Sequence, residues 1–319
     1  MARIKNRLRY LAAVIFVVSL CIGFSGTTVM GAVEVSFLYR LSDFSGPIPF
    51  QWATLQTDAE RNEIYVVDMH ERDVRVFNDR GMEIFRFGDD GTLGSVADVA
   101  VEENGNILVL ASRGGRLVLI VCNFRGEPAL ELNFKNFPPE FAAILPENIA
   151  YRDERIYLLD RKALKIVVID KEGRFQKGYD IGANLGISER KRLETEIGGF
   201  SVDSQGNMLF TIPVLFAAYK LLPDGTIKGF GSPGSAPGKF GIVGDIVADE
   251  SDYYYVADRL RSVVLIFDRD FRFIKEFGYR GPRPMNLIGP RHLVLDPEGR
   301  LYVSQLQYRG VSVFKITHD

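Results

Sequence analysis

The sequence predicts an all-β protein: a six-bladed β-propeller with four antiparallel strands per blade and a ring closed by an N-terminal strand. Three observations support this prediction. A short strand-like segment recurs about every 45 residues, a period in the range of propeller blades. A second apolar run follows each copy at a constant offset. The last copy lacks a fourth strand, and a segment near the start of the chain can replace it.

Six short apolar segments mark the repeat. They are residues 64–68, 107–111, 156–160, 208–212, 254–258 and 301–305. Nine residues after the second position of each segment, an apolar residue opens another strand-like run. These residues are Val74, Leu117, Ile166, Ala218, Val264 and Val311. An offset that holds in all six copies indicates one structural unit repeated six times.

Turn residues divide each unit into four strands. An earlier strand precedes most of the six segments, and Asn104-Gly105, Gln205-Gly206 and Glu298-Gly299 provide tight turns between the two. Later turns, such as the one around Gly173, lead to a fourth strand. Small antiparallel sheets of this kind bury both faces against their neighbours when they are arranged in a ring.

The ring closes with the start of the chain. The sixth unit ends after its third strand, at residues 311–316, and no fourth strand follows. Residues 33–42 have a mixture of aromatic, aliphatic and charged positions similar to that of the fourth strand at 271–278. We therefore expect residues 33–42 to complete the sixth blade.

The first 31 residues have the pattern of a secretory signal peptide. Arg3, Lys5, Arg7 and Arg9 precede an apolar run at residues 10–24 that carries no charge. About 15 apolar residues fall short of the roughly 20 that span a bilayer as a helix. We predict a signal peptide at 1–31 and a propeller at 32–319, with an uncleaved anchor as the alternative. The protein is then exported to the periplasm or the extracellular space, where it is membrane-anchored if the signal stays uncleaved.

Charge and cysteine content narrow the function. Without residues 1–31 the chain has 35 basic and 41 acidic residues, because four of the 39 basic residues lie in that segment. A mildly acidic propeller has no charge surplus for nucleic acid. After cleavage Cys122 stands alone within an apolar run, so we expect a buried thiol rather than a disulfide or a reactive group.

The fifth unit carries a family resemblance. Residues 230–234 and 237–241, followed by 246–249, 255–258 and 264–268, closely resemble an NHL repeat. The chain is thus similar to NHL-repeat six-bladed β-propellers of the exported bacterial type. Some proteins that look like this family act as lyases or lactonases through a metal and a base at the channel mouth, and the resemblance brings that activity in as an alternative.

Polar residues near the mouth of the central channel are candidate metal ligands. Six residues occupy equivalent positions about four before the ends of the inner strands: Thr54, Asp98, Asn148, Gly199, Asp245 and His292. Of these, Asp98, Asn148, Asp245 and His292 could ligate a divalent cation, with calcium or magnesium favoured by oxygen ligands and zinc by histidine. The alternative is that these side chains cap strand ends and bind neighbouring loops.

The loops between second and third strands are rich in basic residues. They carry Arg72, Arg113, Arg116, Arg161, Lys162, Arg259, Arg261 and Arg309. Guanidinium groups suit carboxylates and phosphates, so we expect Arg113, Arg161, Arg259 and Arg309 to form a partner-binding face. The alternative is an ordinary solvated surface with some arginines paired to aspartates.

Two insertions extend the same face. Residues 184–196 suggest a short exposed helix with Ser188 as N-cap, and residues 281–290 suggest a rigid loop. Such loops carry recognition or act as spacers.

The sequence favours a non-enzymatic binding or scaffolding propeller outside the cytoplasm. It would dock an extracytoplasmic protein or an anionic polymer through the loops of one face, and would meet a membrane only through an uncleaved N-terminal segment. The alternative is a metal-dependent lyase or lactonase-like enzyme with its site at the channel mouth. No nucleophile-elbow or zinc-protease motif is present in the sequence.

Overall fold

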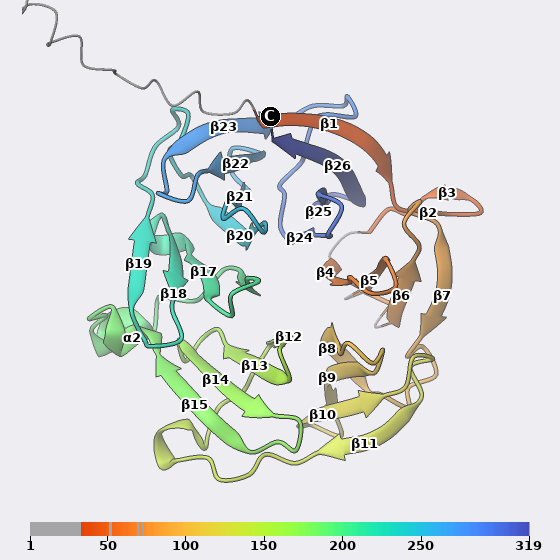
Figure 1. Ribbon diagram of the computed structural model, residues 1–319, viewed down its shortest axis with the longest axis vertical. Helices are drawn as coiled ribbons and strands as arrows, with labels where there is room; N and C mark the ends of the chain where they lie inside the picture. Colours follow the sequence, from red (N-terminus) through yellow and green to blue (C-terminus); the bar gives the residue numbers. More distant parts are fainter. Residues whose placement is uncertain (1–32, 51–52, 69, 72, 319) are drawn as a thin grey trace, which may run out of the picture. The chain divides into compact units, whose positions relative to one another are not determined.

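The computed structural model describes residues 33–50, 53–68, 70–71 and 73–318. Residues 33–317 form one compact unit. Six four-stranded sheets are arranged around a central axis, which confirms the six-bladed propeller (Figure 1). The predicted signal peptide at 1–31 lies outside the described residues.

The first three blades follow one another along the chain. Blade 1 contains β4 (Ala53–Asp58), β5 (Glu63–Asp68), β6 (Asp73–Phe77) and β7 (Glu83–Phe87). Blade 2 contains β8 (Ser95–Val101), β9 (Ile107–Arg113), β10 (Arg116–Cys122) and β11 (Pro128–Leu132). Blade 3 contains β12 (Asn148–Arg152), β13 (Arg155–Asp160), β14 (Lys165–Asp170) and β15 (Phe175–Asp180).

The last three blades complete the ring. Blade 4 contains β16 (Phe200–Val202), β17 (Met208–Ile212), β18 (Ala217–Leu221) and β19 (Ile227–Phe230). Blade 5 contains β20 (Val243–Ala248), β21 (Tyr254–Asp258), β22 (Val263–Phe267) and β23 (Phe273–Gly278). Blade 6 contains β24 (Leu293–Leu295), β25 (Arg300–Ser304), β26 (Val311–His318) and β1 (Val33–Arg40). The six predicted segments coincide with the second strands, and the residues at the nine-residue offset all fall in the third strands.

Short elements decorate the connections. A hairpin of β2 (Ser42–Asp43) and β3 (Gly46–Pro47) follows β1, and two 3₁₀ turns cover Pro139–Phe141 and Pro213–Leu215. The helices α2 (Ile181–Asn184) and α3 (Glu189–Arg192) lie between β15 and β16. Among the described residues, no helix is both long and apolar enough to cross a membrane.

The hydrophobic core lies between the blades. Strand residues alternate between the two faces of each sheet, so each blade offers apolar side chains to both neighbours. One cluster packs Tyr65 and Val74 of blade 1 against Val99 and Ile107 of blade 2. Equivalent clusters fill the other five junctions, including the one between blades 6 and 1. The ring is therefore held by six similar cores.

The N-terminal strand closes the ring, as predicted. The sheet order of blade 6 is β1, β26, β25 and β24, so the first strand of the propeller pairs with the last. Phe37 packs edge-on against Phe314, with ring centroids 5.8 Å apart. Lys275 Nζ of blade 5 donates a hydrogen bond of 2.7 Å to the carbonyl oxygen of Val33. The predicted segment 33–42 thus supplies the missing outer strand.

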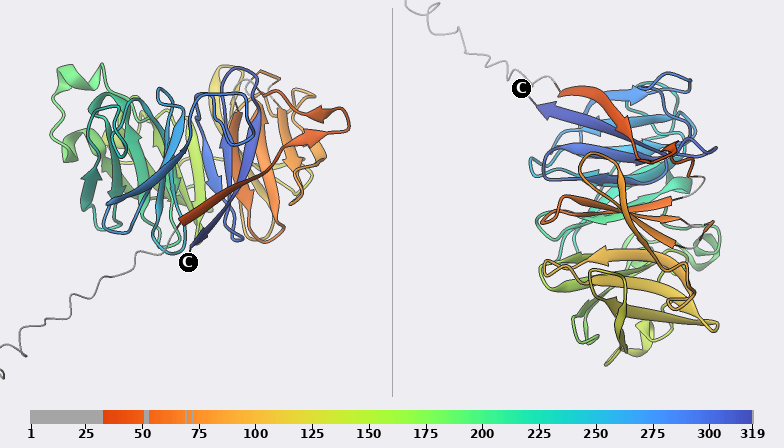
Figure 2. Two further views of the ribbon diagram at one scale, coloured as in Figure 1. Left: turned by 90° about the horizontal axis from the view of Figure 1, so that it is seen from above. Right: turned by 90° about the vertical axis from the view of Figure 1, so that its right-hand side faces the viewer.

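The strand ends define two faces of the ring (Figure 2). Because successive strands are antiparallel, the loops from second to third strands lie on the same face as the connections that lead into each inner strand. Arg113, Arg161, Arg259 and Arg309 all lie in or beside the loops from second to third strands. We call this the arginine face. The α2–α3 insertion belongs to a connection on the same face.

Candidate functional site

Asp98 joins three blades around the central channel. Its Oδ2 accepts hydrogen bonds of 3.1 Å from the amide side chain of Asn148 and from the backbone nitrogen of Ile149, both in blade 3. Its Oδ1 accepts a hydrogen bond of 3.2 Å from Thr54 Oγ1 of blade 1 and one of 3.0 Å from the Val99 nitrogen. Both carboxylate oxygens therefore have protein donors.

Asp245 has the equivalent role in blade 5. Its Oδ2 accepts a hydrogen bond of 3.0 Å from the Leu293 nitrogen of blade 6, and Oδ1 accepts one of 2.9 Å from the Ile246 nitrogen. His292 Nδ1 lies 3.6 Å from Asp245 Oδ2. Gly199 of blade 4 leaves the room that Asp245 needs, since a Cβ there would lie 2.4 Å from Asp245 Oδ1.

The backbone explains why these two carboxylates reach the next blade. The pairing of β8 with β9 is irregular between Val96 and Asp98, and that of β20 with β21 is irregular between Val243 and Ile246. A bulge of this kind re-aims the side chain beside it. Asp98 and Asp245 are thereby directed at backbone amides of the following inner strand.

The four candidate ligands thus fall into two pairs, Asp98 with Asn148 and Asp245 with His292. Burial raises the pKa of Asp98 to about 6, although the donors of Ile149 and Asn148 and the charge of His292 act in the opposite direction. Within the described part of the chain, no group of three or more His, Cys, Asp or Glu side chains is arranged to hold a metal ion. Calcium or magnesium binding stays a prediction. In the structure, Asp98 and Asp245 form hydrogen bonds that join neighbouring blades.

Arg113 and Arg309 are engaged locally. Arg113 forms an ion pair with Glu131 of the neighbouring strand β11. Arg309 donates hydrogen bonds of 3.0 Å from one terminal nitrogen to the carbonyl oxygens of Pro282 and Arg283, which ties the β25–β26 loop to the predicted rigid loop. Burial and the nearby charge of Arg309 lower the pKa of Arg40 at the end of β1.

Arg161 and Arg259 both act electrostatically on Arg291, which precedes the inner strand β24. Arg161 Nε donates a hydrogen bond of 2.8 Å to the carbonyl oxygen of Ile197, and its guanidinium lies 3.9 Å from Glu147 and 4.0 Å from Glu196. Arg259 Nε is buried and has no hydrogen-bond partner in the part of the chain that the structure describes. No carboxylate of the described residues lies within 4.0 Å of the Arg259 guanidinium, which distinguishes it from Arg113.

Arg291 was missed by the sequence prediction. It precedes His292 at the start of blade 6, and its backbone nitrogen donates to the carbonyl oxygen of Ser304. Burial, together with the charges of Arg259 and Arg161, lowers the pKa of Arg291 to about 10, while Glu196 acts in the opposite direction. The signal available in the sequence was its position on the same face, one residue before a predicted channel residue.

The predicted insertion helix is present in part. Ser188 is the N-cap of α3, as expected, but its side chain makes no capping hydrogen bond. The better-capped helix is α2, where Asp180 accepts a hydrogen bond of 2.8 Å from the Ala183 nitrogen. Arg192 then pairs with Asp180 at 2.9 Å and holds the two short helices together.

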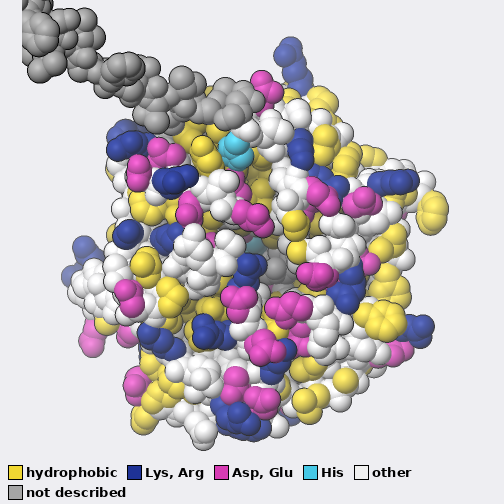
Figure 3. Space-filling view, in the orientation of Figure 1, with side chains coloured by type: hydrophobic (Ala, Val, Ile, Leu, Met, Phe, Trp, Pro, Cys, Tyr) yellow, Lys and Arg dark blue, Asp and Glu magenta, His cyan; other side chains and the backbone are white. Residues whose placement is uncertain are grey.

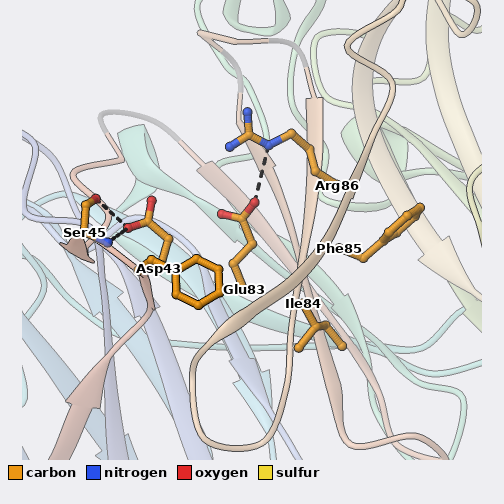
Figure 4. Close-up of a pocket in the computed structure, with 7 residues that line it drawn as sticks. Asp43, Ser45, Glu83, Ile84, Phe85 and Arg86 are labelled. Carbon is orange, nitrogen blue, oxygen red and sulfur yellow. Dashed lines mark hydrogen bonds and ion pairs between the residues drawn. The ribbon is translucent and has the colours of Figure 1, made fainter.

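A shallow groove on the outer rim was not predicted. It lies between the β2–β3 hairpin and the outer strand β7 of blade 1, and Figure 4 shows its lining side chains. Phe44 at the hairpin tip is fully exposed, and Ile84 and Phe85 are exposed on β7. Arg86 pairs with Glu83 at 3.4 Å. None of its lining residues belongs to an inner strand.

Charged side chains of both signs are mixed over the face that Figure 3 shows. Such mixing gives little net field over a large surface. This is the face on which β26 ends, so the arginine face is the opposite one, which Figure 3 does not show.

Solved structures share the fold over most of the chain. A protein of unknown function from Bacteroides thetaiotaomicron has a TM-score of 0.64 at 13% identity, covering 90% of this chain and 76% of its own. A catalytically inactive virginiamycin B lyase from Staphylococcus aureus with quinupristin has a TM-score of 0.57 at 11% identity, covering 90% and 100%. A gluconolactonase from Xanthomonas campestris has a TM-score of 0.54 at 11% identity, covering 90% and 91%.

These similarities show the fold and leave the activity open, because one fold hosts many functions. No protein-family model matches the sequence, and no curated protein matches it either. The NHL resemblance therefore stays a prediction. The chain is a six-bladed β-propeller whose structural neighbours include a virginiamycin B lyase, a gluconolactonase and a protein of unknown function.

Proposed function

We propose that this propeller is a binding or scaffolding protein outside the cytoplasm, and that it docks an acidic protein or an anionic polymer through the arginine face. The observation that carries the proposal is the state of Arg259. No carboxylate of the described residues pairs with its guanidinium, and its Nε, which the protein encloses, has no hydrogen-bond partner among those residues. A guanidinium that lacks a carboxylate partner is stabilised when an anionic group pairs with it.

The other arginines of this face differ in how much charge they can offer. Arg113 is already paired with Glu131, so its charge is largely balanced. Arg161 reaches Glu147 and Glu196 only at 3.9 and 4.0 Å, and both glutamates are exposed to water. Weak, solvated pairs of this kind exchange readily for a better-placed anion. The binding role therefore centres on Arg161 and Arg259.

Charge reversal tests the proposal. The double variant Arg161→Glu/Arg259→Glu should lose capture of partners from an envelope extract that the unmodified protein retains. Arg272→Glu is the matched control, because Arg272 is exposed and follows the turn after β22, on the opposite face. Equal capture by the double variant and the control would remove the arginine face as the docking surface.

A second candidate is a metal-dependent lyase or lactonase-like enzyme. The favouring observation is the His292–Asp245 pair, 3.6 Å apart beside the inner strands, in a fold shared with a virginiamycin B lyase and a gluconolactonase. Metal analysis of the purified protein distinguishes the two proposals. A stoichiometric metal that is lost in Asp98→Ala, Asp245→Ala and His292→Ala variants supports the enzyme, whereas a metal-free protein argues for binding alone.

A further inference from the structure

Side chains from four consecutive blades converge over the axis on the arginine face. Arg161 follows β13 of blade 3, Glu196 leads into blade 4, Arg259 follows β21 of blade 5 and Arg291 leads into β24 of blade 6. Arg161 approaches Glu196 at 4.0 Å, and Arg291 experiences the charges of the other three. Groups from four neighbouring blades of a ring come this close only near its axis.

The group carries an excess of positive charge. It contains three guanidinium groups and one carboxylate, with Glu147 reaching only Arg161, at 3.9 Å. Guanidinium groups stay protonated in proteins, so the repulsion among them is not relieved by loss of a proton. Burial lowers the pKa of Arg291, and the repulsion from Arg259 and Arg161 lowers it further.

We infer that Arg161, Arg259 and Arg291 form a binding site for a carboxylate group of the ligand, near the axis of the arginine face. This inference rests on the proposed binding function and narrows it to one site and one ligand group. Arg259 supplies a guanidinium that no carboxylate of the described residues pairs with, and the charges of Arg161 and Arg291 add to its positive field. A carboxylate accepts two parallel hydrogen bonds from a guanidinium fork, which fits this donor set.

A carboxylate fits better than a phosphate because of the two glutamates. Glu147 and Glu196 are exposed to water and lie beside Arg161. These carboxylates would repel a dianionic phosphate more strongly than a ligand carboxylate, which carries a single negative charge. Glu196 is thus a competitor for the site, and its removal should strengthen binding.

The test is a titration of the purified full chain with sodium acetate, followed through the side-chain Nε–Hε NMR signals of the arginines, with chloride and inorganic phosphate at matched ionic strength. We expect saturable shifts with acetate and weaker binding of phosphate. Arg259→Gln should weaken acetate binding by about tenfold or more, the loss typical of one hydrogen bond between charged groups. Glu196→Gln should tighten it by about threefold, since a nearby like charge is removed.

The gain expected from Glu196→Gln separates a binding site from a folding effect, because a poorly folded variant does not bind more tightly. Arg272→Gln on the opposite face serves as the control and should bind acetate like the unmodified protein. Shifts that do not saturate, that saturate at the same acetate concentration in Arg259→Gln as in the unmodified protein, or that show tighter binding of phosphate than of acetate would overturn the inference.

The inference and the proposed docking can fail separately. If the unmodified protein binds acetate saturably but the variant Arg161→Glu/Arg259→Glu captures partners as before, the docking role is removed and the carboxylate site is kept. If the unmodified protein does not bind acetate saturably but its partner capture depends on these arginines, the docking role is kept and the carboxylate site is removed.

Discussion

Asp98 should make the propeller more stable in mildly acidic solution than at neutral pH. Its pKa is raised from the ordinary 3.8 to about 6 because it is buried. The folded protein therefore binds this proton more tightly than the unfolded chain does, so protonation favours folding. The contribution is present at low pH and is lost as the pH rises through the folded pKa.

The magnitude follows from the shift. A displacement of about two pKa units corresponds to about 3 kcal/mol at neutral pH, when the buried carboxylate is ionised. Between about pH 4.5 and about pH 7.5, Asp98 alone should lower the free energy of unfolding by about 2 kcal/mol. Asp98→Asn should remove this slope, because asparagine is neutral and of nearly the same shape as the protonated acid.

The assay is urea unfolding of both proteins across this pH range, with the exposed Asp153→Asn as a control for a lost surface charge. The difference between the free energies of unfolding of the unmodified protein and Asp98→Asn isolates Asp98 from other titrating groups. A difference that stays constant with pH, or that changes in the direction favouring the unmodified protein as the pH rises, would refute the reasoning.

Two further predictions concern the core and the closing strand. Cys122 is fully buried, and burial raises the pKa of its thiol to about 12. A thiol reagent should therefore leave Cys122 unmodified in the native protein and label it fully after unfolding in urea. Rapid labelling of the native protein would contradict its burial. Phe37→Ala should lower the free energy of unfolding by about 2 to 3 kcal/mol, less than a fully buried phenylalanine, because β1 then loses its contact with Phe314. Leu38→Ala, an exposed neighbour on the same strand, should change little in the same urea titration, and equal losses in the two variants would show that the ring does not depend on this contact.

The repeat in the sequence predicted the blades because their packing is periodic. The nine-residue offset to Val74 and its counterparts reflects a second and a third strand joined by a loop of restricted length, and every blade needs that geometry. β1 was predictable for a related reason. A propeller leaves no unpaired place in its last blade, so the missing fourth strand had to come from elsewhere in the chain.

Contacts between blades were harder to predict. Asp98 was recognised as a channel residue, but its partners Thr54, Asn148 and Ile149 depend on a bulge that no local sequence pattern announced. Arg291 was missed because the basic residues were sorted by the loops between second and third strands, whereas this one leads into an inner strand. The proximity of charged residues from four different blades follows from the closed ring and cannot be read from the sequence of any one blade.

Closure by β1 also sets an order of events for a chain that is threaded out of the cell, as proposed here. β1 would emerge first, yet its partner β26 is the last strand to be made, and Lys275 contacts Val33 across 242 residues of sequence. β1 would then stay solvated and unpaired until β26 has been synthesised. Distant pairing of this kind slows folding and leaves apolar edges open to wrong partners. Export of this propeller would therefore depend on whatever protects its leading strand during that interval.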